Sequence, residues 1–174
     1  KSLLKLQFPN PWSKDFSARD GFNIMPFVAT LRLIYILNQK MGQRGLSKTE
    51  FCLFVPTLIN ASDIEKYVDL ILDFRRRDKN GKEEFIVQFL KEFYGIEELP
   101  IKKINNLWDY GDNIMRYFRL TKYFKVVTDP LGYHWRIDLE PSRLTEIEQL
   151  LKMYKGAALS FETLNAYLDY LVDI

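Results

Sequence analysis

The feature that most constrains this fold is a helix with one polar face, followed directly by two short segments of residues that favour β-strands. Apolar side chains recur at helical spacing over residues 101–119, and the opposite side of the helix is polar and rich in asparagine. Residues 124–128 and 133–139 are rich in β-branched and aromatic side chains, and the segment 129–132 between them carries Pro and Gly where a turn needs them. The pattern predicts an amphipathic helix and then a β-hairpin, which is how a winged-helix DNA reader is built. The apolar side of the helix comprises Ile104, Leu107, Trp108, Gly111, Met115 and Phe118.

The distribution of charge supports a nucleic-acid partner better than its total does. The formal net charge is only +2, which is too small to argue for DNA by itself. Residues 101–125 carry six lysines and arginines against two aspartates, whereas residues 137–174 carry three against seven acids. Such a split predicts one face for phosphates and an acidic end that faces solvent or another part of a larger protein.

Composition places the chain among globular intracellular proteins. Its 174 residues are 47% apolar and 15% aromatic, which is ample for a hydrophobic core. No apolar run reaches the length of a membrane span, and no secretory leader is recognisable, so we expect a soluble protein with no membrane partner. The chain opens at Lys1 rather than Met and ends in an apolar helical pattern without a stop signal, so we expect a piece of a larger protein.

Helix-start signals predict further helices on both sides of the helix and hairpin. Pro26 suits the first turn of a helix that Gly42 ends. Ser47 and Ser62 are each followed three residues later by glutamate, which is the capping-box pattern, and each opens another helix. After a turn at residues 79–81, a helix marked by apolar residues from Phe85 to Phe93 is predicted to end at Gly95, and two more helices are predicted over residues 141–153 and 160–172.

These elements predict a mainly α fold with a small β-hairpin, arranged as a winged-helix (helix-turn-helix) DNA-binding architecture with extra helices. We expect an N-terminal arm over residues 1–25 and a winged-helix DNA-recognition domain with inserted helices over residues 26–139. A C-terminal helical extension is expected over residues 140–174.

The polar face of the predicted 101–119 helix has the residue types that read bases in a major groove. An asparagine amide can pair with both Hoogsteen-edge groups of adenine, and an arginine fork can bind guanine. A solvated helix face is the alternative explanation, and the hairpin directly after the helix favours DNA contact. The predicted base-contacting residues are Asn105, Asn106, Asp109, Asn113 and Arg116.

Cations around the helix and the hairpin are the predicted phosphate contacts. Arg76 and Lys79 belong to a separate basic cluster over residues 75–82, although charge runs at a helix end are more often solvated and also favour the helix dipole. The predicted phosphate-contacting residues are Lys102, Lys103, Arg119, Lys122, Lys125, Arg136, Arg76 and Lys79.

No residue pattern points to catalysis or to a metal site in this segment. Cys52 lies in an apolar run and is expected to be a buried structural thiol, and His134, the only histidine, is expected to be structural or a wing contact. No Asp or Glu is followed two places later by Lys, so the acid and acid-x-lysine motif of metal-dependent restriction cleavage is absent. We therefore expect no catalytic residue, no metal ligand and no cofactor here.

Four sequence blocks, taken in order, resemble the DNA-recognition half of AlwI-like type IIS restriction and nicking endonucleases, which are related in plan to FokI. The blocks are residues 3–11, 26–34, 45–54 and 116–124, and the likeness spans most of residues 1–153. The resemblance implies winged-helix subdomains that bind an asymmetric site, joined to a separate nuclease domain or subunit that uses Mg²⁺ to cut nearby. It also implies a prokaryotic, cytoplasmic protein. Base-contacting residues vary with the site recognised, so none is carried over from the family.

The leading hypothesis is sequence-specific recognition of double-stranded DNA by part of a type IIS restriction endonuclease, a type II site-specific deoxyribonuclease, with no small-molecule substrate. A winged-helix transcriptional regulator shares every local feature, although it would normally be a dimer on a palindromic site. A helical protein-interaction module, in which the asparagine-rich face is merely solvated, is the third hypothesis. Salt-dependent DNA affinity separates this last hypothesis from the other two.

Overall fold

The fold is mainly helical, with one small sheet. The computed structural model describes residues 2–8, 23–40, 42–94, 101–153, 166 and 169. The α-helices in these residues are α1 (Pro26–Gln39), α2 (Lys48–Phe54), α3 (Ile64–Arg76), α4 (Lys79–Tyr94), α5 (Ile101–Leu120) and α6 (Leu144–Met153). The strands are β1 (Leu46–Ser47), β2 (Phe124–Thr128) and β3 (Trp135–Leu139). Short 3-10 helices span Ser2–Lys5, Ala61–Asp63 and Pro141–Arg143.

The three strands form one antiparallel sheet in the order β1-β3-β2. Ile137 at its centre is paired with Leu46 on one side and Val126 on the other. The predicted hairpin is confirmed, with β2 at the predicted bounds, but β3 begins only at Trp135. Strand β1 was not predicted, because two residues carry no readable alternation. It approaches β3 so closely that a Cβ on Gly45, which has φ 68°, would lie 2.3 Å from the Ile137 carbonyl oxygen.

An aromatic cluster fixes α5 to the sheet and to α1 and α2. The Phe118 ring lies 4.5 Å from the Phe27 ring and 5.1 Å from each of the Phe51 and Phe124 rings, measured between centroids. Phe51 also meets Trp135 of β3 at 5.3 Å. Edge-on and tilted aromatic pairs such as these add to the hydrophobic gain of burying large rings. The predicted apolar side of the 101–119 helix is therefore the packed side.

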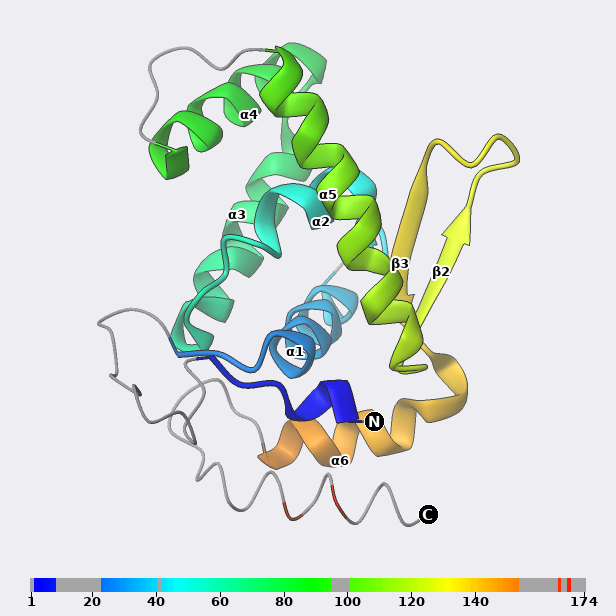
Figure 1. The fold of residues 1–174 in the computed structure, drawn as a ribbon. Helices are drawn as coiled ribbons and strands as arrows, with labels where there is room; N and C mark the ends of the chain where they lie inside the picture. Colours follow the sequence, from blue (N-terminus) through cyan, green and yellow to red (C-terminus); the bar gives the residue numbers. More distant parts are fainter. Residues whose placement is uncertain are drawn as a thin grey trace.

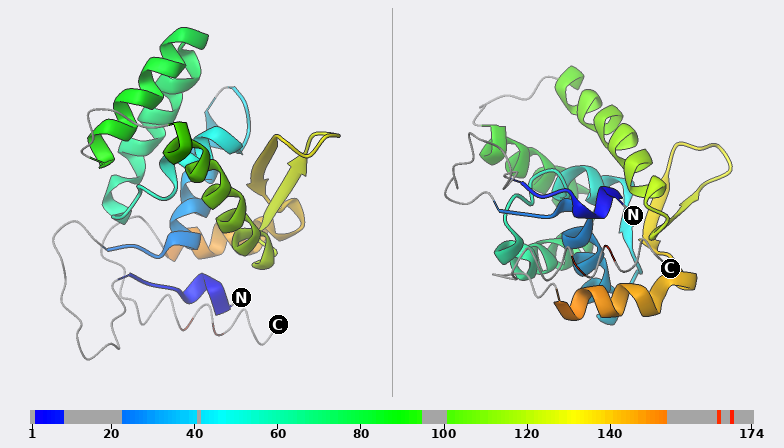
Figure 2. Two further views of the ribbon diagram at one scale, coloured as in Figure 1. Left: turned by 45° about the horizontal axis from the view of Figure 1, so that its top comes forward. Right: turned by 60° about the horizontal axis from the view of Figure 1, so that its bottom comes forward.

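Helix α2 also joins this core to a helical pair, α3 and α4, inserted before α5. The Phe54 ring on α2 lies 6.0 Å from the Phe74 ring of α3 and 5.2 Å from the Phe89 ring of α4. Phe85 adds a further contact at 6.0 Å from Phe54. Figures 1 and 2 show the α3–α4 pair at one end of the molecule and α6 at the other, with α5 lying between the pair and the hairpin.

Two of the predicted helix starts differ from the structure. The capping box at Ser47 is confirmed, with Glu50 accepting from the Ser47 amide at 2.9 Å. The second capping box, at Ser62, is wrong, because the Asn60 side chain accepts from the Ser62 amide and a 3-10 turn precedes α3. The predicted 79–81 turn is also wrong. The Asp78 carboxylate accepts from the Gly81 amide at 2.7 Å, which satisfies a first-turn donor and lets α4 begin at Lys79.

Some predicted segments cannot be compared with the structure. The helix predicted over residues 160–172 lies outside the described residues, apart from two isolated positions. The predicted N-terminal arm is described only in part, and there Phe8 forms an antiparallel bridge with Ile24. No helix among the described residues combines the length and the apolar character needed to cross a membrane.

Candidate nucleic-acid interface

The outward face of α5 carries all five predicted base-contacting side chains. Asn105, Asn106, Asp109, Asn113 and Arg116 are each exposed. The helix presents them on one side because its opposite side packs on α2 and the sheet, burying Met115 and Phe118. The structure therefore brings the predicted set together on one surface.

Three large side chains on the same face were missed by the sequence analysis. Tyr110, Tyr117 and Leu120 are 64%, 57% and 66% exposed. Tyr110 and Tyr117 each follow an asparagine of the face by four residues, which is one helical turn. That spacing could have predicted that the two tyrosines lie on the polar face. Dividing the helix into polar and apolar residues did not reveal this, because tyrosine and leucine are not counted as polar.

Asp112 ties α5 to both α2 and β3. Lys48 Nζ lies 2.8 Å from Asp112 Oδ2, and Trp135 Nε1 donates to Asp112 Oδ1 at 2.7 Å. Burial alone would raise the pKa of the Asp112 carboxyl, but the hydrogen bonds from Lys48 and Trp135, with the charges of Lys48 and Arg116, outweigh burial and lower that pKa. One carboxylate thus links α5 to both α2 and the hairpin.

The β2–β3 hairpin runs back beside α5, and its turn projects away from the rest of the molecule (Figures 1 and 2). Large side chains near this turn are exposed. Leu131 is 78% exposed and Tyr133 is 70% exposed. Tyr123 anchors the base of the hairpin, because its hydroxyl donates to Glu146 Oε2 of α6 at 2.6 Å. Burial, aided by Glu146, raises the pKa of Tyr123 well above its ordinary value, so the hydroxyl stays a donor.

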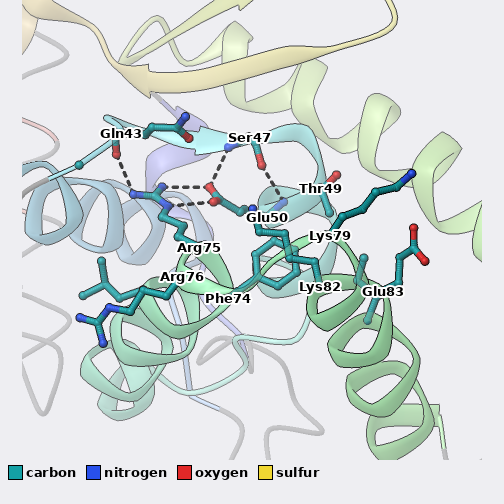
Figure 3. Close-up of a pocket in the computed structure, with 13 residues that line it drawn as sticks. Gln43, Ser47, Thr49, Glu50, Phe74, Arg75, Arg76, Lys79, Lys82 and Glu83 are labelled. Carbon is teal, nitrogen blue, oxygen red and sulfur yellow. Dashed lines mark hydrogen bonds and ion pairs between the residues drawn. The ribbon is translucent and has the colours of Figure 1, made fainter.

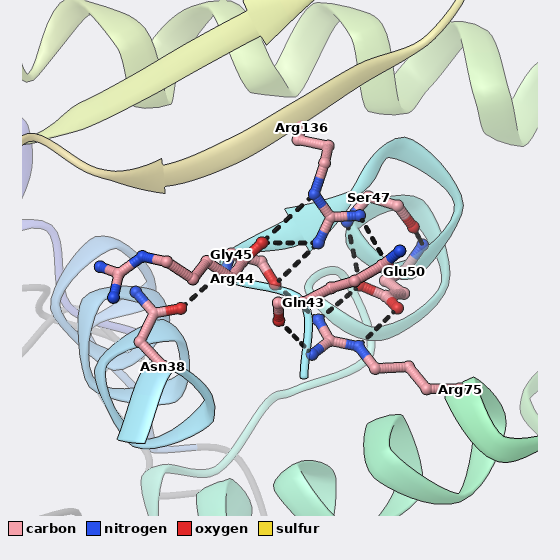
Figure 4. Close-up of polar contacts among 8 residues, drawn as sticks. All are labelled: Asn38, Gln43, Arg44, Gly45, Ser47, Glu50, Arg75 and Arg136. Atoms are coloured by element: carbon pink, nitrogen blue, oxygen red, sulfur yellow. Dashed lines mark hydrogen bonds and ion pairs between the residues drawn. The ribbon is translucent and has the colours of Figure 1, made fainter. Parts of the chain in front are cut away.

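All of the predicted phosphate-contacting cations are exposed except Arg136. The Arg136 guanidinium is half-buried and donates to the Arg44 carbonyl at 2.6 Å and 3.2 Å, and to Gln43 Oε1 at 3.3 Å. Figure 4 shows Arg136 and Arg75 approaching the 43–45 loop from two sides. Arg136 therefore holds the loop before β1, a role that the sequence pattern did not indicate.

The basic cluster over residues 75–82 divides into internal and outward-facing cations. Arg75 forms a two-point ion pair with Glu50, at 2.8 Å and 2.9 Å, and donates to the carbonyls of Gln43 and Gly45 at 2.7 Å and 2.6 Å. Arg76 and Lys79 extend outward (Figure 3) and form no ion pair among the described residues. Arg77 is also exposed but pairs with Asp73, so Arg76 and Lys79 are the exposed cations of this cluster without an ion pair among the described residues.

Cys52 and His134, which were predicted to be neither catalytic nor metal-binding, occupy different environments. Cys52 is buried beneath α5, as predicted, and burial raises the pKa of its thiol to about 12, so the thiol stays protonated near neutral pH. His134 is exposed in the hairpin turn. Among the residues that the structure describes, no group of three or more His, Cys, Asp or Glu side chains is placed to hold a metal ion.

Comparison with known families gives the class of protein to which this interface belongs. The model of the AlwI restriction endonuclease family matches residues 1–171. The chain therefore belongs to the AlwI restriction endonuclease family, as the four sequence blocks predicted. No curated protein matches the chain. Membership supports a restriction-enzyme role and makes DNA the implied partner.

Proposed function

We propose that this chain is the sequence-specific DNA-recognition portion of a type IIS restriction endonuclease. In this proposal α5 enters the major groove and the β2–β3 hairpin is the wing. The observation that carries it is the α5 surface, where asparagines and cations share one exposed face beside a projecting hairpin. Family membership supplies the restriction-enzyme context.

The order of elements supports a winged-helix arrangement. A winged-helix domain runs helix, strand, helix, recognition helix and two wing strands, with the first strand pairing with the last. Here α1, β1, α2, α5, β2 and β3 follow that order, and β1 pairs with β3. The α3–α4 pair is then an insertion between the second helix and the recognition helix.

Base reading and phosphate anchoring would fall to different parts of the surface. Asn106 and Asn113 suit adenine edges, Arg116 suits guanine, and Asp109 suits a cytosine amino group. Neighbouring cations would fix the register of the protein on the duplex without reading sequence. These anchors are Lys102, Lys103, Arg119, Lys122 and Lys125.

Phosphodiester cleavage belongs, in this proposal, to a separate nuclease domain or subunit, together with its Mg²⁺. Magnesium in such nucleases is held by clustered carboxylates. The described residues offer no cluster of that kind, so no step of the proposal runs through a metal in this chain.

Selection from a randomised duplex pool tests the proposal. Bound duplexes of about 30 base pairs, or about three helical turns, would be enriched and sequenced. We expect a single asymmetric motif for the wild-type chain. Asn106→Ala with Arg116→Ala should degrade the motif at the positions these residues read, at about 1–3 kcal/mol of discrimination for each bidentate pairing removed.

A matched control changes an amide and a cation elsewhere. Gln149→Ala with Lys152→Ala on the exposed side of α6 should leave the motif intact. An unchanged motif in the α5 variant would overturn the assignment of α5 as the recognition helix.

The exposed aromatic residues of α5 favour a second candidate, a protein-interaction module. Tyr110 and Tyr117 are of the residue type enriched at protein interfaces. This candidate predicts no salt-dependent affinity for duplex DNA, whereas the leading proposal predicts affinity that falls steeply as salt rises.

A further inference from the structure

Two surface cavities lie next to each other at the start of α2, and we refer to the pair as the groove. The first, which we call the insertion cavity, has a volume of about 700 Å³ and lies against the α3–α4 junction, with Arg76, Lys79 and Lys82 among its lining residues. The second, the wing cavity, has a volume of about 420 Å³ and lies against the hairpin. Ser47 and Thr49 line both cavities, so the two cavities adjoin at these residues.

The insertion cavity carries an excess of positive charge. Arg75 is neutralised by Glu50, which leaves Arg76, Lys79 and Lys82 against one further acid, Glu83. Arg76 and Lys79 have no ion-pair partner among the described residues, and the Lys82 amine lies over the Phe74 ring at 5.6 Å. These cations lie along the cavity on two helices and do not converge on one point (Figure 3).

The wing cavity continues the groove toward the proposed DNA-reading surface. It is lined by Lys48, which is hydrogen-bonded to Asp112 of α5, and by the half-buried Arg136. Asp129 also lines it, and its Oδ1 atom is buried with no hydrogen-bond partner among the described residues. The groove therefore runs from beside α5 and the hairpin, across the start of α2, to the inserted helices.

The shape of the groove is held by the half-buried Arg75. Its guanidinium binds Glu50, the second residue of the Ser47 capping box, and two carbonyls of the 43–45 loop (Figures 3 and 4). The inserted pair is thus locked to the start of α2, and Arg76 and Lys79 keep a set position relative to the rest of the groove.

We propose that this groove binds the sugar-phosphate backbone of one DNA strand beyond the base pairs that α5 reads, so that the α3–α4 insertion acts as a backbone clamp. The inference rests on the proposed function, because it extends the same duplex across the surface. Phosphates of a single strand form a row of negative charge, which an elongated groove with separated cations fits better than a single anion.

Salt-dependent binding of the full chain tests the clamp. Arg76→Ala with Lys79→Ala would be compared with wild type by fluorescence anisotropy, using a duplex of about 30 base pairs carrying the motif found by selection. We expect affinity to fall for specific and unrelated duplexes alike. The slope of log affinity against log salt should become shallower by about 1 for each phosphate that the protein no longer neutralises.

Controls separate the clamp from general charge and from the recognition helix. Lys66→Ala with Lys152→Ala removes two exposed cations outside the groove and should leave the slope unchanged. A duplex trimmed to about one helical turn, about 10 base pairs, should bind wild type and the groove variant equally, because it lacks the flanking phosphates.

Two outcomes would contradict the clamp proposal and leave the proposed function unaffected. An unchanged slope in the groove variant, while Asn106→Ala with Arg116→Ala still loses discrimination, would exclude the groove from the interface. If inorganic phosphate binds the wild-type chain but not the groove variant, while both bind the duplex equally, the cavity holds a single anion rather than a backbone. Unchanged discrimination in the α5 variant, Asn106→Ala with Arg116→Ala, would instead overturn the proposed function.

Discussion

Gly111 of α5 lies directly against Cys52 of α2, so closely that a Cβ on Gly111 would be 2.0 Å from the Cys52 Sγ atom. No side chain larger than hydrogen fits at this crossing. The close approach is what brings the neighbouring Asp112 within hydrogen-bond reach of Lys48 and Trp135. The placement of the proposed recognition helix thus depends on one glycine and one small buried thiol.

Gly111→Ala should lower the free energy of unfolding by about 1–3 kcal/mol, because the added methyl group overpacks the α2–α5 contact. Helix propensity alone predicts the opposite, a gain of about 1 kcal/mol. Chemical denaturation measures which effect wins. Adding Cys52→Ala should recover most of the stability, since the remaining contact is with the Cys52 Cβ at 3.2 Å. A stabilised Gly111→Ala variant would contradict the close packing.

Arg75→Met should destabilise the protein by about 3–5 kcal/mol, because it leaves the Glu50 carboxylate buried without its partner. The side chains of Arg75 and Glu50 are only 14% and 4% exposed. Arg77→Met is the control, since Arg77 pairs with Asp73 on the surface and should cost about 1 kcal/mol or less. Equal effects of the two substitutions in denaturation experiments would refute the structural role of Arg75.

Lys122→Gly should raise stability by about 1 kcal/mol while weakening DNA binding. Lys122 has φ 62°, a left-handed conformation that costs a non-glycine residue energy and that glycine adopts freely. Lys122→Ala removes the same charge but keeps the strain, so it should weaken binding equally without the gain in stability. Thermal unfolding and anisotropy titrations of both variants measure the two effects separately. A loss of stability in the glycine variant would contradict the strain argument.

Asp112→Asn should cost stability at neutral pH, and the cost should disappear in acid. The folded-state pKa of Asp112 is lowered from the ordinary value of 3.8, so its ionised form stabilises the fold above pH 3.8. That contribution disappears as the pH falls below 3.8 toward the folded-state pKa. Unfolding free energies between about pH 3 and pH 7 would show the difference from wild type shrinking at the acid end. In a Lys48→Ala background the pH dependence should be weaker, because one hydrogen bond to the carboxylate is gone.

Much of the proposed interface could be predicted from local sequence. The 101–119 helix, its asparagine-rich face and the hairpin after it follow from apolar periodicity and turn chemistry, which act over a few residues. The capping box at Ser47 is local for the same reason. The predictions at Ser62 and at the 79–81 turn also rested on local sequence, and both were wrong. In each case a nearby side chain, that of Asn60 or Asp78, accepts a hydrogen bond from a backbone amide at the start of the helical segment.

Sequence by itself determined the helix, the hairpin and the family to which the chain belongs. The helix and the hairpin depend on short-range residue patterns, and the family depends on the order of four sequence blocks. Tertiary structure alone decided which cations are accessible. Arg136 meets the Arg44 carbonyl across 92 residues of sequence and Arg75 meets Glu50 across 25, and no local pattern encodes such meetings. The groove at the start of α2 is likewise formed by three distant segments. Those contacts arise only when the aromatic core has brought the elements together, which is why similar arginines end up buried in one place and free in another.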